Sequence, residues 1–305
     1  MHMANIIEWN VGLDNYKKCT LEIGTPSNKF TTELLDVPIK TGRSITDIFN
    51  DHLANRQTKY VEILYSGGLD SELVLLSCIK NNIPVIVMTL IIKVDGMIIN
   101  THDLYYAEKF CREHNITHKL IELNANKFFE NGIYLDYLVP YYIIEPHVAT
   151  HFWLIEQCDY FPILGGDWPW VHTHLENKIV SPSRLEFSSY ERFMKDKGIN
   201  GIGNMIGYSL EASCKFIKMH IDNHIPGETT SNFKSRMYQQ MYPELEPRMR
   251  SYGWEHHRNK TNLFNILNYK IELLKRVRPN SSQIKWNNVI KTLLNASANK
   301  NDKFR

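Results

Sequence analysis

The residues best equipped for chemistry form one short run, Ser66-Gly67-Gly68-Leu69-Asp70-Ser71. Its two glycines let the backbone turn sharply and present N–H groups without a Cβ in the way. Those N–H groups, the first donors of a following helix and the hydroxyls of Ser66 and Ser71 together make an anion cradle. Asp70 adds a hard oxygen ligand by which Mg²⁺ would be held against a triphosphate. The run therefore predicts a nucleotide site.

The elements on either side of the run suit that role. A strand is predicted over residues 60–65 and a helix over residues 71–81, so the glycines lie where a strand turns into a helix. The sequence contains no Gly-x-x-x-x-Gly-Lys-Ser/Thr segment. The loop that cleaves γ-phosphate in ordinary nucleoside triphosphatases is therefore excluded.

The run resembles the PP-loop of the ATP pyrophosphatase superfamily, whose pattern is Ser-Gly-Gly-x-Asp-Ser. The resemblance covers roughly residues 58–185. In that superfamily the second strand carries the backbone that meets adenine, which implies contacts at Met88 and Leu90 near the end of a strand predicted over residues 83–92.

A second segment, Ile163-Leu164-Gly165-Gly166-Asp167, resembles the second glycine-acidic loop of the synthetase domain of asparagine synthetase. In that family the loop lies across the cleft from the PP-loop and helps to bind the substrate and the activated intermediate. The resemblance implies that Gly165 and Gly166 contribute to the site. It also implies that Asp167 orients the substrate or a second magnesium ion.

The family resemblance implies a two-step reaction that uses ATP and Mg²⁺. An oxygen of a carboxylate or amide-like carbonyl attacks the α-phosphorus, pyrophosphate leaves, and a nitrogen or sulfur nucleophile then captures the adenylated substrate and releases AMP. We expect a small-molecule substrate and an amine or ammonia donor, and so a ligase that forms an amide or related C–N bond.

Missing motifs narrow the choice within the superfamily. His2 and Met3 stand where glutamine-using asparagine synthetases carry a nucleophilic cysteine, and about 58 residues are too few for a glutaminase domain. The paired cysteines of tRNA-thiolating relatives, the cysteine zinc site of 7-cyano-7-deazaguanine synthases and the terminal motif of sulfonucleotide reductases are also missing. Argininosuccinate synthetases place a threonine between the two residues that correspond to Asp70 and Ser71. The asparagine-synthetase-like branch remains.

The second half of the chain offers further candidates. Lys234 or Arg236, on a helix predicted over residues 232–241, could reach the triphosphate, and Lys234 is the assigned catalytic cation. The polar and aromatic segment at residues 247–255 is a weaker substrate-binding candidate. The aromatic residues and histidines at residues 168–174 could border the cleft or simply pack.

Strands alternating with helices between residues 59 and 185 predict an α/β fold built on a parallel sheet. The resemblance implies a Rossmann-like, adenine-nucleotide alpha-hydrolase-like core. We assign residues 1–58 to a small β-containing N-terminal cap, residues 59–185 to the core and residues 186–305 to a helical C-terminal region, with a helix predicted over residues 205–220.

The composition is that of an ordinary globular protein. The chain has 305 residues, 43% hydrophobic, and a formal charge of +2, so it has no overall drive toward nucleic acid or anionic membranes. Five scattered cysteines and no long apolar run predict a cytoplasmic protein with reduced thiols and no membrane partner. A homo-oligomer is compatible with the sequence.

Two alternatives stay open. The C-terminal segment after residue 272 is rich in lysine and arginine, which would suit an enzyme that modifies a nucleobase in tRNA or DNA by the same adenylation. A relative that binds nucleotide without turnover is the other alternative. The intact glycine run argues against this second alternative, because a relative without turnover would be expected to have a degenerate loop.

Overall fold

The computed structural model describes the core of the chain and parts of its flanks. The described residues are 9–10, 19–23, 30–34, 43–54, 56–141, 146–166, 170–174, 177–181, 185–209, 211–212, 215–216, 219, 223, 225 and 227–247. The predicted substrate segment at residues 247–255, beyond its first residue, and the basic C-terminal segment lie outside them, as does Asp167. Within the described part, no helix is both long and apolar enough to cross a membrane.

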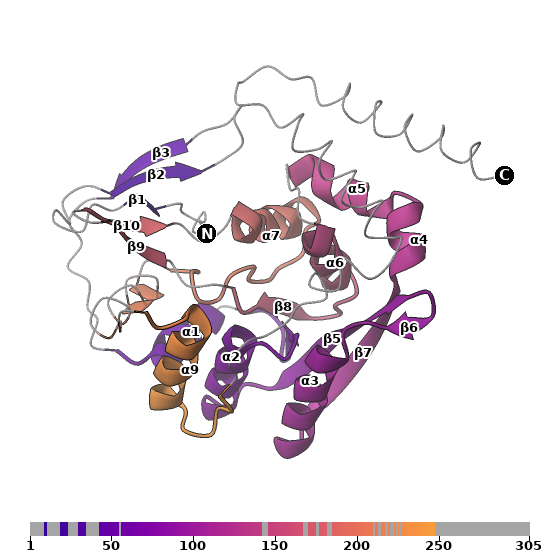
Figure 1. Cartoon of the computed structure of the whole chain (residues 1–305), viewed down its shortest axis with the longest axis horizontal. Helices are drawn as coiled ribbons and strands as arrows, with labels where there is room; N and C mark the ends of the chain where they lie inside the picture. Colours follow the sequence, from indigo (N-terminus) through magenta and orange to yellow (C-terminus); the bar gives the residue numbers. More distant parts are fainter. Residues whose placement is uncertain are drawn as a thin grey trace.

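A mostly parallel sheet forms the centre of the molecule (Figure 1). Its parallel strands are β4 (Val61–Leu64), β5 (Val85–Val94), β7 (Thr117–Asn124) and β8 (Phe161–Leu164). β5 lies between β7 and β4, and β4 pairs on its other side with β8. A short strand, β6 (Met97–Ile98), folds back antiparallel on the end of β5.

Helices cover both faces of the sheet, so the fold is the predicted α/β architecture (Figure 1). One face carries α1 (Ile45–Leu53), α2 (Leu69–Lys80), α3 (Thr101–Glu113) and α9 (Thr230–Met241). The other carries α4 (Ala125–Glu130), α5 (Ile133–Leu138), a 3-10 turn (Val139–Tyr141), α6 (Pro146–Ile155) and α7 (Leu185–Asp196). Each face has its own apolar core because successive strand residues point to opposite sides: Ile63 belongs to the first core and Leu64 to the second.

Most elements predicted for the core are confirmed to within a few residues, but three helices differ. α4 and α5 were not predicted, because six-residue helices are too short to show a clear periodicity. The helix predicted from Met205 is wrong at its start. Met205 and Ile206 instead donate backbone hydrogen bonds to the carbonyl groups of Leu164 and Gly165, at 3.0 and 3.1 Å. Tertiary pairing with β8 thus overrides a local helical pattern.

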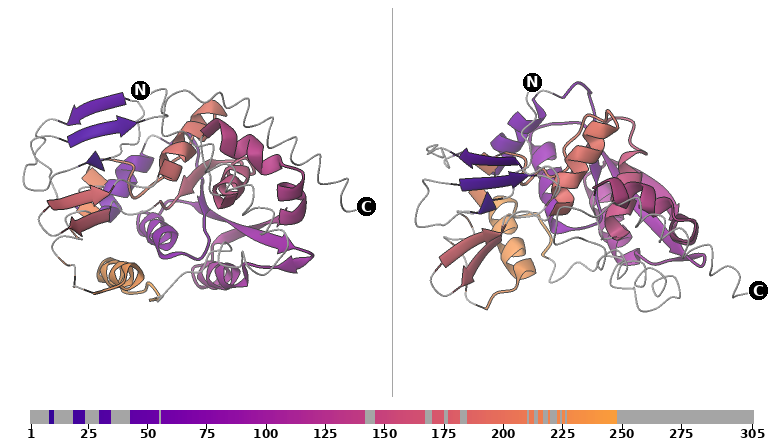
Figure 2. Two further views of the ribbon diagram at one scale, coloured as in Figure 1. Left: turned by 45° about the horizontal axis from the view of Figure 1, so that its top comes forward. Right: turned by 90° about the horizontal axis from the view of Figure 1, so that it is seen from above.

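Two small antiparallel sheets flank the core. The first contains β1 (Trp9–Asn10), β2 (Cys19–Ile23) and β3 (Phe30–Leu34), of which β3 was not predicted. The second is a hairpin of β9 (Trp170–His174) and β10 (Asn177–Ser181), also not predicted. β1 lies beside β10, which brings the N-terminal strands next to the segment that follows β8 (Figure 2).

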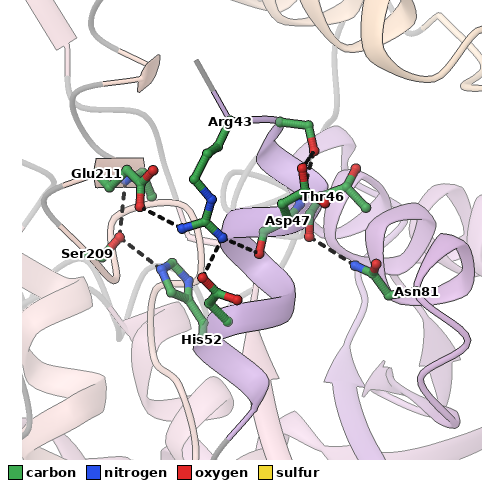
Figure 3. Close-up of polar contacts among 10 residues, drawn as sticks. Arg43, Thr46, Asp47, His52, Asn81, Ser209 and Glu211 are labelled. Carbon is green, nitrogen blue, oxygen red and sulfur yellow. Dashed lines mark hydrogen bonds and ion pairs between the residues drawn. The ribbon is translucent and has the colours of Figure 1, made fainter. Parts of the chain in front are cut away.

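α1 is held against the core by polar contacts at both of its ends (Figure 3). Ser44 caps the helix, accepting from Asp47 N at 3.1 Å. Arg43 pairs with Glu211 at 3.2 Å, and the His52 ring lies 2.8 Å from Ser209 Oγ. Burial lowers the pKa of His52 to about 4, so the ring is neutral at physiological pH. α1 therefore packs into the core, although the sequence places it in the cap; the domain boundaries themselves stay predictions.

α9 is fastened to α2 by a buried hydroxyl network. Tyr242, which ends α9, hydrogen-bonds through its OH to Ser77 Oγ at 2.7 Å and to Thr46 Oγ1. Ser77 in turn donates to the carbonyl of Leu73 within α2 at 2.8 Å. Buried hydroxyl groups are stable only when they are hydrogen-bonded, so this network fixes how α9 lies against α2.

Candidate functional site

The glycine run forms a tight turn between β4 and α2. Gly67 has a φ of +71°, and a Cβ added there would lie 2.7 Å from the Asp103 carbonyl oxygen, so both conformation and packing demand glycine. Gly68, at the N-cap of α2, has a φ of −82° and room for a Cβ. Among the described residues, no side-chain hydrogen bond caps α2 at Gly68. The N–H groups in the first turn of a helix have no partner within the helix and can bind an anion.

The start of the turn is fixed by β5. Tyr65 N donates to the Met88 carbonyl at 2.9 Å, and Thr89 Oγ1 donates to the Tyr65 carbonyl at 2.7 Å. His118 Nε2 lies 2.9 Å from the same Thr89 hydroxyl. Because the hydroxyl has only one proton, which Tyr65 accepts, His118 must be the donor in that second bond.

Sheet order places two glycine turns side by side. The chain runs from β4 outward to β5 and β7 and then returns to the opposite side of β4 with β8, so the sheet order reverses between β4 and β8. Ligands of open α/β sheets bind outside the carboxyl ends of the strands at such a point. Gly165, directly after β8, is so close to the first turn of α2 that an added Cβ would lie 2.8 Å from Ser71 N.

α9 brings two side chains onto Asp70. Lys234 Nζ lies 2.7 Å from Asp70 Oδ2, and the Tyr238 hydroxyl donates to Asp70 Oδ1. Lys234 and Tyr238 are buried, at 7% and 0% exposure. The structure thus places the Lys234 ammonium next to the glycine turn, and its catalytic role stays a prediction. Arg236 instead pairs with Glu228 at 2.6 Å.

The other predicted nucleotide-binding residues differ in which of their atoms a ligand could contact. Ser66 is exposed and Ser71 half-buried, so both hydroxyls border the turn, whereas the Leu69 side chain is 7% exposed and only its backbone can serve a ligand. The carbonyl of Leu90 accepts from Asn100 Nδ2 at 2.7 Å, and the carbonyl of Met88 accepts from Tyr65 N. Adenine contact at Met88 and Leu90 remains a prediction.

Sequence reasoning missed Tyr238 and Asn204. Asn204 is fully buried, and its Oδ1 accepts from Gly207 N at 3.0 Å. Its Nδ2 has no hydrogen-bond partner among the residues that the structure describes. A Cβ on Gly166, whose φ is +89°, would lie only 1.7 Å from Asn204 Oδ1. The sequence signal for this segment is its three closely spaced glycines, at positions 201, 203 and 207.

Glu191 on α7 holds the backbone beside this second glycine turn. Its Oε1 accepts from Gly203 N. Burial raises the pKa of Glu191 to about 7, and hydrogen bonds from the backbone of Gly203 and Asn204 offset part of that increase. A carboxyl group in this position titrates near neutral pH.

We therefore expect the Glu191 carboxyl to make the protein less stable as the pH rises. A raised carboxyl pKa means that the folded state binds the proton more tightly than the unfolded state. The contribution is fully present below the ordinary pKa of 4.5 and is lost as the pH rises through about 7. Over that window the free energy of unfolding should fall by up to about 3 kcal/mol.

Urea unfolding of the wild type and of Glu191→Gln between pH 4.5 and 8 measures this effect. Glutamine keeps an oxygen for Gly203 N but cannot titrate, so the difference in stability between the two proteins should change with pH in that window. A difference independent of pH would contradict the assignment.

The donors present fit a magnesium ion. Magnesium in phosphate-transfer sites is held by one or two carboxylates together with substrate phosphates and water. Asp70 supplies one carboxylate next to the anion cradle. In the described part of the chain, no three histidine, cysteine or acidic side chains come together as a ready-made metal cage. A single carboxylate beside an anion cradle suits an ion that arrives together with a nucleotide.

Comparison with known proteins gave only distant similarities. No protein-family model and no curated protein matches the chain. Among solved structures, an NH3-dependent NAD synthetase from Campylobacter jejuni is 15% identical, with 70% of this chain and 98% of that chain covered and a TM-score of 0.31.

Two other solved structures give similar values. An NMN synthetase from Francisella tularensis is 13% identical (82% of this chain, 99% of that chain, TM-score 0.33), and a U34-tRNA thiolase from Methanococcus maripaludis is 14% identical (82% and 87%, TM-score 0.32). None of the three is described as an asparagine synthetase. Similarity at this level does not establish a shared activity.

Proposed function

We propose that this chain is an ATP-pyrophosphatase-type ligase that adenylates a small molecule and completes an amide or related C–N bond. The observation that carries the proposal is the convergence of Asp70 and Lys234 at the start of α2, beside a glycine turn. A phosphate chain needs N–H donors, a metal ligand and a cation together. Gly165 and Gly166, on the neighbouring strand, supply an adjoining place for the acceptor.

In this reaction the chain mainly positions charge. The turn N–H groups and the hydroxyls of Ser66 and Ser71 bind the β- and γ-phosphates, and Asp70 holds the magnesium ion, which when bound stabilises negative charge on the phosphate oxygens. An acceptor oxygen bonds to the α-phosphorus as the bond to the bridging oxygen of pyrophosphate breaks. Lys234 stabilises the charge that develops on the departing pyrophosphate.

The second step needs a nitrogen nucleophile. An amine or ammonia attacks the activated carbon, the nitrogen loses its proton, and the carbon–oxygen bond to AMP breaks. Residues at the second glycine turn would hold the acceptor for both steps, and for Asp167 this role rests on the family resemblance. Fixed donors need no reorganisation as charge develops, so they lower the barrier without covalent work by side chains.

The test is a product assay with a pool of metabolites. The purified protein receives ATP, Mg²⁺, ammonia and fractionated small molecules, and pyrophosphate, AMP and the consumed compound are measured by mass. We expect AMP and pyrophosphate in equal amounts with one consumed acceptor. ADP and phosphate, or no bound nucleotide at all, would contradict the proposal.

The same assay separates the nucleobase-modifying alternative. Addition of tRNA or DNA in place of metabolites should leave pyrophosphate release at background. Stimulation by nucleic acid, together with salt-sensitive binding that disappears when residues after 275 are deleted, would favour that alternative instead.

A further inference from the structure

Both carboxylate oxygens of Asp70 are already occupied by α9. The Lys234 ammonium lies 2.7 Å from Oδ2, with side-chain exposures of 9% for Lys234 and 24% for Asp70, and the Tyr238 hydroxyl donates to Oδ1. The pair is shielded enough from water for its charges to matter, since screening weakens with burial. Asp70 in this arrangement is a neutralised carboxylate.

A neutralised carboxylate is a poor magnesium ligand. Magnesium gives up its hydration water reluctantly and needs the negative charge of its ligands. Lys234 cancels that charge and, as a cation next to the site, would repel a second cation. In the state described here, metal and lysine therefore compete for the same oxygen.

We propose that Lys234 keeps the metal site closed until nucleotide arrives, and then exchanges Asp70 for the nucleotide's phosphates while Mg²⁺ takes its place on Asp70. This exchange rests on the proposed function. It makes metal binding depend on nucleotide, because the phosphates offer the Lys234 ammonium an anionic partner in exchange for Asp70. Asp70 keeps a cationic partner throughout, since Mg²⁺ replaces the Lys234 ammonium, and the nucleotide phosphates balance the additional positive charge of the metal.

The two α9 side chains are suited to different parts of this exchange. The Lys234 ammonium lies at the end of a flexible side chain, so it can move by rotation about the side-chain bonds. Tyr238 is a rigid ring at 0% exposure, packed in the same core as Phe233 and Met237. Tyr238 is therefore a positioning residue that keeps Asp70 aimed at the glycine turn after the lysine leaves.

The experiment measures binding, not turnover, in Lys234→Met. Mn²⁺ affinity without nucleotide is measured by electron paramagnetic resonance, and ATP affinity with metal chelated by calorimetry. We expect the variant to bind Mn²⁺ about tenfold more tightly and metal-free ATP about tenfold more weakly, as typical coupling energies imply. A lysine that only holds α9 in place would weaken both.

Arg236→Met is the matched control. It removes a cation of the same helix, one that pairs with Glu228 at 2.6 Å, and changes the net charge equally. We expect both affinities to stay within about twofold of the wild type. Tighter Mn²⁺ binding in this control would attribute the effect to net charge and overturn the exchange.

Tyr238→Phe separates charge from occupancy. It removes a neutral donor from Asp70 and keeps the ring, so Mn²⁺ affinity should not rise. A rise equal to that in Lys234→Met would show that vacating either oxygen suffices, and would overturn the exchange.

If the wild type bound Mg²⁺ and ATP and released pyrophosphate while Lys234→Met left Mn²⁺ affinity unchanged, only the exchange would fail. If the wild type bound no ATP, the proposed function would fail first.

Discussion

Asp70→Asn is expected to lower pyrophosphate release by at least about a thousandfold, because it removes the carboxylate charge that the metal requires while preserving the shape of the side chain. Such a loss corresponds to about 4 kcal/mol of transition-state stabilisation. Pyrophosphate release at saturating ATP and acceptor measures it. Asparagine keeps one oxygen that accepts from Lys234, and the Tyr238 hydroxyl can accept from the amide nitrogen, so the variant should fold.

Asp159→Asn provides the control for this result. Asp159 pairs with Lys119 at 2.8 Å, a geometry similar to that of Asp70 with Lys234, but away from the glycine turns. The Asp159→Asn variant should release pyrophosphate at the same rate as the wild type. Near-normal pyrophosphate release from Asp70→Asn would remove the assignment of this site.

Gly165→Ala is expected to cost about 3 kcal/mol of stability and to weaken ATP binding more than tenfold. The added Cβ would lie 2.8 Å from Ser71 N and 2.9 Å from the Asp70 carbonyl carbon. These are backbone atoms of the helix start, which cannot yield as a flexible side chain would, so the two glycine turns must separate. Denaturant unfolding and calorimetric ATP titration measure the two effects.

Gly68→Ala is the companion variant. An added Cβ there meets nothing closer than Ser66 Oγ at 3.5 Å, and the φ of −82° is open to alanine. Its stability should fall by no more than about 1 kcal/mol, the usual cost of alanine at an N-cap. Equal destabilisation in both variants would contradict the close packing of the two turns.

Local patterns in the sequence were sufficient to locate the glycine run between a strand and a helix. The alternation of apolar strands with amphipathic helices predicted the parallel sheet, since these periodicities depend only on near neighbours in the chain. Elements whose form depends on distant partners were missed. Met205 and Ile206 are apolar and compatible with a helix, yet their backbone N–H groups hydrogen-bond to the chain at the end of β8.

The sequence by itself determined the chemistry offered at residues 66–71 and the α/β class that presents it. Only the tertiary structure decided that Lys234, and not Arg236, reaches Asp70, and that Tyr238 and Asn204 belong to the site. Lys234 and Asp70 are 164 residues apart, and their meeting depends on how α9 packs against α2 through contacts such as Tyr242 with Ser77. Contacts between distant residues arise from packing of the whole core, which no local spacing encodes.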